Sequence, residues 1–185
     1  MVNQININQI ILIILDGLGY NMKYHSNAIK QANTPTLDLL WQTYPNTLLN
    51  ASENYVGLPK GQMGNSEVGH TTIGAGRIIN QELVRISQSI KIGDFFKNHI
   101  MNSIYFNTKN NKKKMHLIGL CSNGGVHSHI DHLKGLLSAL AKEQVHDVFV
   151  HAFTDGRDTD PKGGVGYIED LINHMDETTG RLSTI

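Results

Sequence analysis

Apolar residues occur along the chain in short continuous runs, which predict buried strands. The clearest run covers residues 9–15, where β-branched side chains follow one another almost without a break. Continuous rather than alternating hydrophobicity is typical of a strand that is buried on both faces of a parallel sheet. Three further strands are predicted over residues 47–51, 115–121 and 145–153.

Between these runs, apolar residues recur at helical spacing. Residues 130–144 place their leucines on one face, and residues 36–43 follow Thr34 as N-cap and Pro35 as first helical residue. The strand, helix and strand in residues 115–153 predict a βαβ unit with a right-handed crossover, and therefore an α/β protein. The other predicted helices cover residues 79–90, 93–106 and 162–175, and a polar, glycine-rich loop covers residues 57–65.

Two features of this pattern bear on domain organisation. A domain junction is predicted near residues 77–81, which divides residues 1–78 from residues 79–185. The final residues, 180–185, are strand-like and carry no terminating signal, so we expect the structure to continue beyond them.

Composition excludes several functional classes. The formal net charge is zero, and the lysine-rich stretch at 109–114 has no interleaved aromatic residues, so we expect a solvated turn and no nucleic-acid partner. The run at 10–15 is too short to span a bilayer, and we expect neither a signal peptide nor a membrane anchor. Cys121 is the only cysteine, which excludes an intrachain disulfide and fits a reducing compartment. We expect its thiol to be buried and inert.

Polar residues that could take part in binding or catalysis follow the apolar runs. Asp16 comes directly after the first predicted strand, where ligands gather in open α/β sheets, and is either a ligand of a divalent metal or part of an Asp-Gly turn. Ser66 lies in a glycine-rich string and could cap a helical turn, near backbone amides that suit phosphate. A serine hydroxyl needs a base or a metal to become nucleophilic, and the alternative is a surface loop with a capping serine.

Two more loops follow predicted strands. In the first, His127 and His129 could bind a metal or a phosphate, although a substrate contact fits better because no cysteine pair is nearby to complete a zinc site. In the second, Arg157 can grip a carboxylate or phosphate, and Asp158 can exchange a proton with a sugar-acid hydroxyl. The alternative for this pair is a salt-bridged surface turn. The histidines at 132, 146 and 151 belong to no motif, and we interpret them as ordinary core or surface residues.

Four strings together resemble the cofactor-independent phosphoglycerate mutase family. They are Ile13-Ile14-Leu15-Asp16-Gly17, Gly64-Asn65-Ser66-Glu67-Val68-Gly69-His70, Gly125-Val126-His127-Ser128-His129 and Thr154-Asp155-Gly156-Arg157-Asp158-Thr159. Their order and spacing match as well, so the resemblance covers essentially the whole chain. It implies a parallel-sheet, phosphatase-like domain of the alkaline phosphatase superfamily, with its N-terminal part in residues 1–78, and part of an inserted α/β phosphotransferase domain in residues 79–185.

The resemblance also implies roles for individual residues. Ser66 resembles the nucleophile that becomes phosphoserine, and Asp16, together with Ser66, resembles a ligand of one of two Mn²⁺ ions. His127, Arg157 and Asp158 resemble the residues that hold the glyceric acid, with Asp158 as the candidate for proton transfer. The implied reaction interconverts 3-phosphoglycerate and 2-phosphoglycerate in glycolysis and gluconeogenesis, without 2,3-bisphosphoglycerate.

Length is the departure from the family, whose members are far longer than 185 residues. We therefore expect an N-terminal fragment that is inactive alone, with the other metal ligands beyond residue 185, and a monomer when complete. The expected partner is a small-molecule phosphoglycerate, and the expected location is the cytoplasm or, if organelle-encoded, the plastid stroma. Two other readings stay open: a phosphomonoesterase or sulfatase of the same superfamily, and a non-catalytic ligand-binding fragment.

Overall fold

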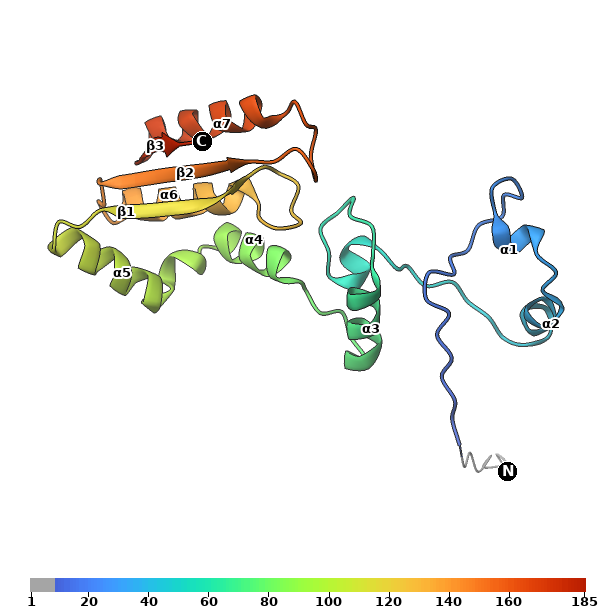
Figure 1. Ribbon diagram of the computed structural model, residues 1–185. Coiled ribbons are helices and arrows are strands. Elements are labelled where there is room, and N and C mark those ends of the chain that lie inside the picture. Colours follow the sequence, from blue (N-terminus) through green and yellow to red (C-terminus); the bar gives the residue numbers. More distant parts are fainter. Residues whose placement is uncertain (1–8) are drawn as a thin grey trace.

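A three-stranded parallel sheet organises the C-terminal half of the molecule. The computed structural model describes residues 9–185, and its strands β1 (Met115–Cys121), β2 (Val148–Thr154) and β3 (Arg181–Thr184) lie in the order β1-β2-β3 (Figure 1). Helices α6 (Ile130–Lys142) and α7 (Gly164–Glu177) are the crossovers. The predicted βαβ unit is therefore confirmed, and the strand-like end of the chain forms β3.

The sheet and its crossover helices share one core. Leu137 and Leu140 of α6 and Leu171 of α7 are fully buried, and they belong to the same cluster as Val148 and Val150 of β2. Each large aliphatic side chain buried in this way contributes roughly 1.5–3 kcal/mol of hydrophobic stabilisation. Cys121 also lies in this core with its thiol free and 1% exposed, as predicted. Burial raises the pKa of that thiol, which keeps it protonated and unreactive.

The helices before the sheet differ in detail from the prediction. Helix α4 (Glu82–Ile92) begins later than expected and ends at Gly93, whose φ of 85° is a left-handed conformation. The prediction of a single helix over residues 93–106 is wrong. A short 3₁₀ turn, η2 (Phe95–Lys97), comes first, and Asn98 then starts α5 (His99–Asn110) because its side chain accepts hydrogen bonds from the amides of Ile100 and Met101.

The N-terminal region carries short helices and two corrections. Its helical elements are α1 (Ala28–Gln31), α2 (Pro35–Thr43), the 3₁₀ turn η1 (Glu53–Val56) and α3 (Ser66–Ala75). The strands predicted at 9–15 and 47–51 do not form. Residues 9–15 instead run as an extended segment, with Ile10 and Ile11 exposed by 86% and 82% (Figure 1). A strand needs a neighbour to complete its hydrogen bonds, and the described residues provide none here.

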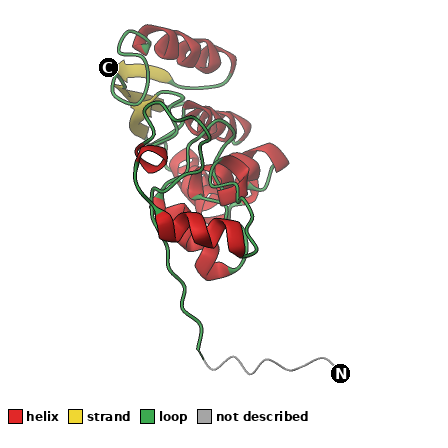
Figure 2. Cartoon of the chain, turned by 90° about the vertical axis from the view of Figure 1, so that its right-hand side faces the viewer, coloured by secondary structure: helices red, strands yellow, loops and turns green. Residues whose placement is uncertain are grey.

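A linker over residues 76–81 joins α3 to α4, and the preceding loop holds it in place. The carbonyl oxygen of Gly57 accepts a hydrogen bond of 2.9 Å from the amide of Gln81. Gly57 has φ of 78°, and a Cβ at this position would lie 1.9 Å from the carbonyl oxygen of Ile79. Figure 2 shows the strands and α7 at one end of the molecule and the extended N-terminal segment at the other. No helix in residues 9–185 is long and apolar enough to cross a bilayer.

Candidate functional site

The carboxyl ends of β1 and β2 bring two of the predicted motifs together. Because the two strands are parallel neighbours, with Cys121 opposite Thr154, the loops that follow them leave the same edge of the sheet. Nε2 of His127 in the first loop lies 3.5 Å from Oδ2 of Asp158 in the second. The His127 side chain is 66% exposed and that of Asp158 only 18%, so the imidazole forms the outer wall of this site.

Arg157 completes the predicted trio from the side of β2. Its backbone amide donates to Oδ1 of Asp155, whereas its exposed guanidinium makes no hydrogen bond or ion pair with residues 9–185. A guanidinium in that state can bind a carboxylate or phosphate with two parallel hydrogen bonds. The site thus offers a cationic fork, an imidazole and a carboxylate within two neighbouring loops.

Two buried residues to which no sequence motif assigned a role hold these loops together. Ser122 and Asp155 are the first residues after β1 and β2, and both are buried. Ser122 Oγ donates a hydrogen bond of 2.7 Å to Asp155 Oδ2. This bond, with those from nearby backbone amides, holds the pKa of Asp155 below its ordinary value. Their place in the sequence was the one feature that could have identified them, since each residue directly follows a strand of the parallel sheet.

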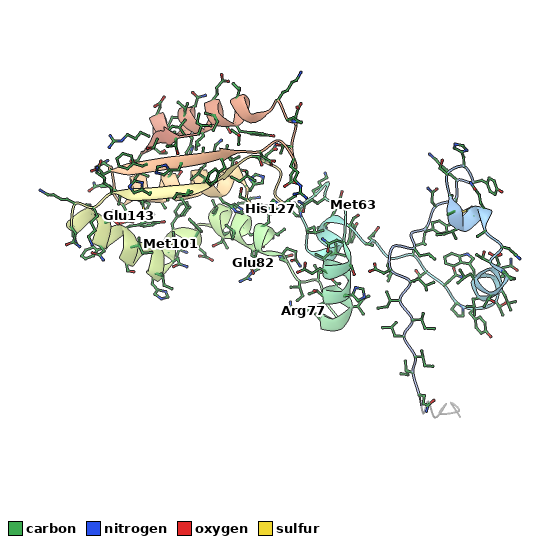
Figure 3. All side chains as sticks on the ribbon, viewed as in Figure 1. Met63, Arg77, Glu82, Met101, His127 and Glu143 are labelled. Carbon is green, nitrogen blue, oxygen red and sulfur yellow. The ribbon has the colours of Figure 1, made fainter. Side chains whose placement is uncertain are left out.

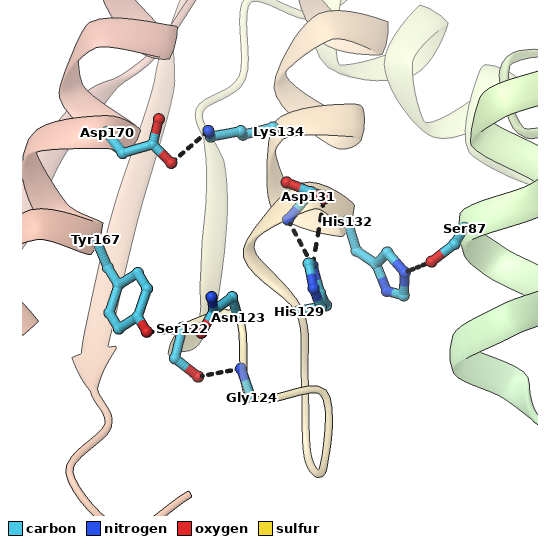
Figure 4. A network of polar contacts seen from close by, with 10 residues as sticks. All are labelled: Ser87, Ser122, Asn123, Gly124, His129, Asp131, His132, Lys134, Tyr167 and Asp170. Carbon is cyan, nitrogen blue, oxygen red and sulfur yellow. Dashed lines mark hydrogen bonds and ion pairs between the residues drawn. The ribbon is translucent and has the colours of Figure 1, made fainter. Parts of the chain in front are cut away.

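Three other histidines of the C-terminal region make structural contacts. Nδ1 of His129 accepts from the amide of Asp131 at 3.2 Å, so His129 caps α6 through this nitrogen (Figure 4). His132 lies 2.9 Å from Ser87 Oγ and ties α6 to α4. His151, which no motif singled out, contacts His116 at 2.9 Å across the sheet.

Ser66 lies at the start of α3, but it does not cap the helix as expected. Asn65 is the N-cap, because its side chain accepts from the amide of Val68 at 3.1 Å. Ser66 Oγ lies 3.2 Å from Nδ1 of His70, and the same nitrogen lies 2.8 Å from the Ser66 carbonyl oxygen. A carbonyl only accepts, so that contact places the proton on Nδ1. His70 therefore offers no lone pair to Ser66 and is not its general base in this arrangement.

Asp16 occupies an exposed turn. Gly17 has φ of 79°, and the amide of Leu18 donates to the carbonyl oxygen of Leu15 at 3.1 Å, which is the geometry of the Asp-Gly turn considered above. No hydrogen bond joins Asp16 to Ser66 in the part of the chain that the structure describes. The structure therefore shows no direct contact between these two predicted residues within residues 9–185.

A divalent metal ion requires more ligands than Asp16 and Ser66 supply. Carboxylate and hydroxyl oxygens are suitable ligands for a hard cation such as Mn²⁺, which favours six oxygen ligands. Within residues 9–185, no three His, Cys, Asp or Glu side chains gather closely enough to hold a metal ion. Asp16 and Ser66 alone therefore do not form a metal centre.

The loops that carry His127 and Asp158 face the region that carries Ser66. The arrowheads of the strands in Figure 1 point toward the side of α3, and Figure 3 shows His127 on the side of the sheet nearest Met63. Contact between the regions is close, since a Cβ at Gly125 would lie 3.5 Å from Nε2 of Gln62. The loop of His127 and the loop before Ser66 are therefore neighbours.

Known proteins share the sequence pattern of this chain. The family described as BPG-independent PGAM N-terminus (iPGM_N) matches residues 86–185, more than half of the chain. This chain belongs to that family. The resemblance predicted from the four strings is confirmed, and so is the α/β fold class.

Relatives of the family extend the match toward the N-terminus. The chain is 59% identical over 168 residues to the 2,3-bisphosphoglycerate-independent phosphoglycerate mutase of Gracilaria tenuistipitata var. liui, covering 91% of this chain and 33% of the relative. It is 54% identical over 175 residues to that of Clostridioides difficile (strain 630), covering 94% and 34%. The chain thus spans about a third of the length of the curated relatives it matches.

A solved structure agrees with the family assignment. The crystal structure of Leishmania mexicana phosphoglycerate mutase at low cobalt concentration is similar, with a TM-score of 0.68 and 28% identity. The match covers 91% of this chain and 32% of that one. The fold of this iPGM_N family member is therefore shared well beyond the residues that the family description matches.

Proposed function

We propose that this chain contributes the N-terminal part of an isomerase that interconverts 3-phosphoglycerate and 2-phosphoglycerate. The observation that carries the proposal is the convergence of His127, Arg157 and Asp158 at one edge of the sheet, in a chain of the iPGM_N family. A three-carbon acid offers a carboxylate to Arg157 and hydroxyls to Asp158, so the loops match its functional groups.

Ser66 is the proposed nucleophile. Its Oγ enters as the alkoxide and attacks the phosphorus of 3-phosphoglycerate, the bond between phosphorus and the C3 oxygen breaks, and that oxygen leaves as a hydroxyl with a proton from protonated Asp158. The C2 hydroxyl then returns a proton to Asp158 and attacks phosphoserine, which frees Ser66 as the alkoxide and yields 2-phosphoglycerate. His127 and Arg157 keep the glycerate bound between the steps. Exclusion of water at this stage prevents hydrolysis to inorganic phosphate.

Metal and domain organisation form part of the same proposal. In the complete protein Asp16 and Ser66 would contribute to a Mn²⁺ site whose remaining ligands lie beyond residue 185, and the ion would neutralise charge on the phosphoryl oxygens. Residues 1–78 are proposed to belong to the metal-binding domain and residues 79–185 to the substrate-binding domain. The protein would need no 2,3-bisphosphoglycerate and would act as a monomer in the cytoplasm or plastid stroma, within glycolysis and gluconeogenesis.

A chimera tests the proposal. It joins this chain to the part of the Gracilaria relative that follows the matched region, and 3-phosphoglycerate conversion is measured with Mn²⁺ present. We expect the chimera to convert the substrate, the Ser66→Ala variant to lose activity, and the chain alone to show none. Release of inorganic phosphate in place of isomerisation would favour the phosphatase alternative. Metal-independent binding of phosphoglycerate with an inactive chimera would favour the non-catalytic one.

A further inference from the structure

One buried pair connects the two loops of the candidate site. Ser122 is 1% exposed and Asp155 is 6% exposed, and the bond of 2.7 Å between them joins the residue after β1 to the residue after β2. A buried hydroxyl bonded to a carboxylate is a strong, charge-assisted contact. It links two loops that are separate in the sequence and adjacent only in the fold.

The same two side chains also organise the backbone of both loops. Oδ1 of Asp155 accepts from the amides of Arg157 at 3.0 Å and of Asp158 at 3.1 Å. On the other side, Ser122 Oγ accepts from the amide of Gly124 at 3.3 Å (Figure 4). Each loop therefore begins with a turn whose amide groups are held by this pair.

Packing leaves little room for the loops to separate or slide. A Cβ at Gly124 would lie 3.1 Å from Cγ2 of Thr159, 3.4 Å from Oδ2 of Asp155 and 3.4 Å from Cβ of Asp158. The first loop thus rests directly on the second through a residue without a side chain. The contact of His127 with Asp158 lies further along the same two loops.

We infer that Ser122 and Asp155 are positioning residues, which hold His127, Arg157 and Asp158 in place to bind the carboxylate and hydroxyls of a glyceric acid. Neither side chain reaches the substrate, because both are buried and their polar atoms are occupied by loop contacts. They act through the loops. The identity of the ligand rests on the proposed function, whereas the coupling between the pair and the loops does not.

The first test measures binding of 3-phosphoglycerate to the chimera by isothermal titration calorimetry, for wild type, Ser122→Ala and Thr179→Ala. Thr179 is the matched control, since it is also buried and its hydroxyl donates to the Val145 carbonyl oxygen at 3.0 Å, away from the site. Loss of one buried hydrogen bond should destabilise both variants. We expect only Ser122→Ala to weaken binding, by about tenfold. Equal affinities in all three proteins, or equal losses in both variants, would overturn the inference.

A second measurement needs no ligand and uses the 185-residue chain itself. Amide hydrogen exchange is followed by NMR in wild type and Asp155→Asn, which keeps one acceptor oxygen but removes the charge. We expect exchange at Arg157 and Asp158 to accelerate about tenfold relative to Val150 in the same sheet. A uniform change at all three amides would mean that the pair stabilises the fold without positioning the loops. If wild-type chimera binds no phosphoglycerate while this local acceleration is seen, the proposed function fails and the positioning role stands.

Discussion

Oδ2 of Asp158 lies 3.5 Å from Nε2 of His127, although the two residues follow different strands. The contact exists because β1 and β2 are parallel neighbours whose carboxyl ends coincide. The carboxylate of Asp158 therefore lies next to the imidazole. Under the proposed function, a bound glyceric acid would meet these two groups together with the exposed guanidinium of Arg157 from the second loop.

The first prediction distinguishes substrate binding by Arg157 from proton transfer by Asp158. In the chimera, Asp158→Asn should lower kcat by about 10²–10⁴-fold, because an amide cannot take a proton from the glycerate hydroxyl. Arg157→Lys should instead raise KM by about tenfold, since an ammonium group cannot make the paired hydrogen bonds of a guanidinium. Steady-state kinetics with 3-phosphoglycerate measure both.

Asp160→Asn is the control for this experiment. Asp160 belongs to the same loop, but its Oδ1 accepts from the amide of Lys162 at 2.8 Å, and the ion pair of His127 is with Asp158. Its kinetics should stay close to wild type. Equal kcat losses in the Asp158 and Asp160 variants would show that any change in this loop lowers activity. That result would contradict the assignment of proton transfer to Asp158.

The second prediction concerns the contact between Gly57 and the linker. Ala at position 57 would place its Cβ 1.9 Å from the carbonyl oxygen of Ile79, so the linker must move away. Gly61→Ala is the matched control, because Gly61 has φ of 83°, similar to the 78° of Gly57, but nothing within 4 Å of its Cβ position. Both variants carry backbone strain of roughly 1 kcal/mol, and only the first adds the collision.

Limited trypsin digestion reads out this difference. Figure 3 shows Arg77 at the α3 end of the linker and Glu82 at its α4 end. Cleavage after Arg77 should be several-fold faster in Gly57→Ala than in wild type, and about unchanged in Gly61→Ala, because release of the linker exposes its backbone. Similar cleavage rates in the two variants would contradict a holding role for Gly57.

The reach of sequence-based prediction differs between the two halves of the chain. β1 was predicted with its observed bounds, and the βαβ unit was correct, because its strands find their partners within residues 115–184. The strand at 9–15 was wrong because an apolar run shows a need for burial and not the partner that supplies it. Grouping of His127 with Asp158 followed from the strand-end rule. The buried pair of Ser122 and Asp155 did not, because small polar residues after a strand usually serve local turns.

The third prediction uses the exposed apolar segment. Ile11 and Ile13 are 82% and 76% exposed. Changing both to Asp should therefore alter the unfolding free energy of the 185-residue chain by less than about 0.5 kcal/mol, as measured with urea. Binding of a hydrophobic dye should fall, because this exposed apolar stretch has gained two charges.

The chimera should respond in the opposite way to the same two substitutions. If residues 1–78 belong to a larger metal-binding domain, this apolar segment becomes covered there, and two buried carboxylates would cost several kcal/mol. We expect the doubly substituted chimera to be insoluble or inactive while the substituted chain stays folded. Full activity of the substituted chimera would contradict the burial of residues 9–15 in the complete protein.

The last prediction is a dependence of stability on pH that arises at His132. Burial of the imidazole is the main cause that lowers its pKa from the ordinary 6.5, and the nearby His129 adds to it, while Asp131 and a backbone contact to Leu83 act against it. The unfolded chain therefore binds a proton at a higher pH than the folded chain does. The stabilisation is fully present above about pH 6.5 and is lost as pH falls through the folded value.

Urea unfolding of the 185-residue chain at pH 7.5 and pH 5.5 measures this effect. Wild type should lose stability between the two values, and His132→Gln should lose less, because Gln keeps a polar contact for Ser87 but does not titrate. His99→Gln serves as control, since His99 is exposed at the start of α5. That variant should keep the wild-type difference between the two pH values. An unchanged difference in His132→Gln would mean that the contact between α4 and α6 is insensitive to protonation, and that the acid loss of stability originates elsewhere.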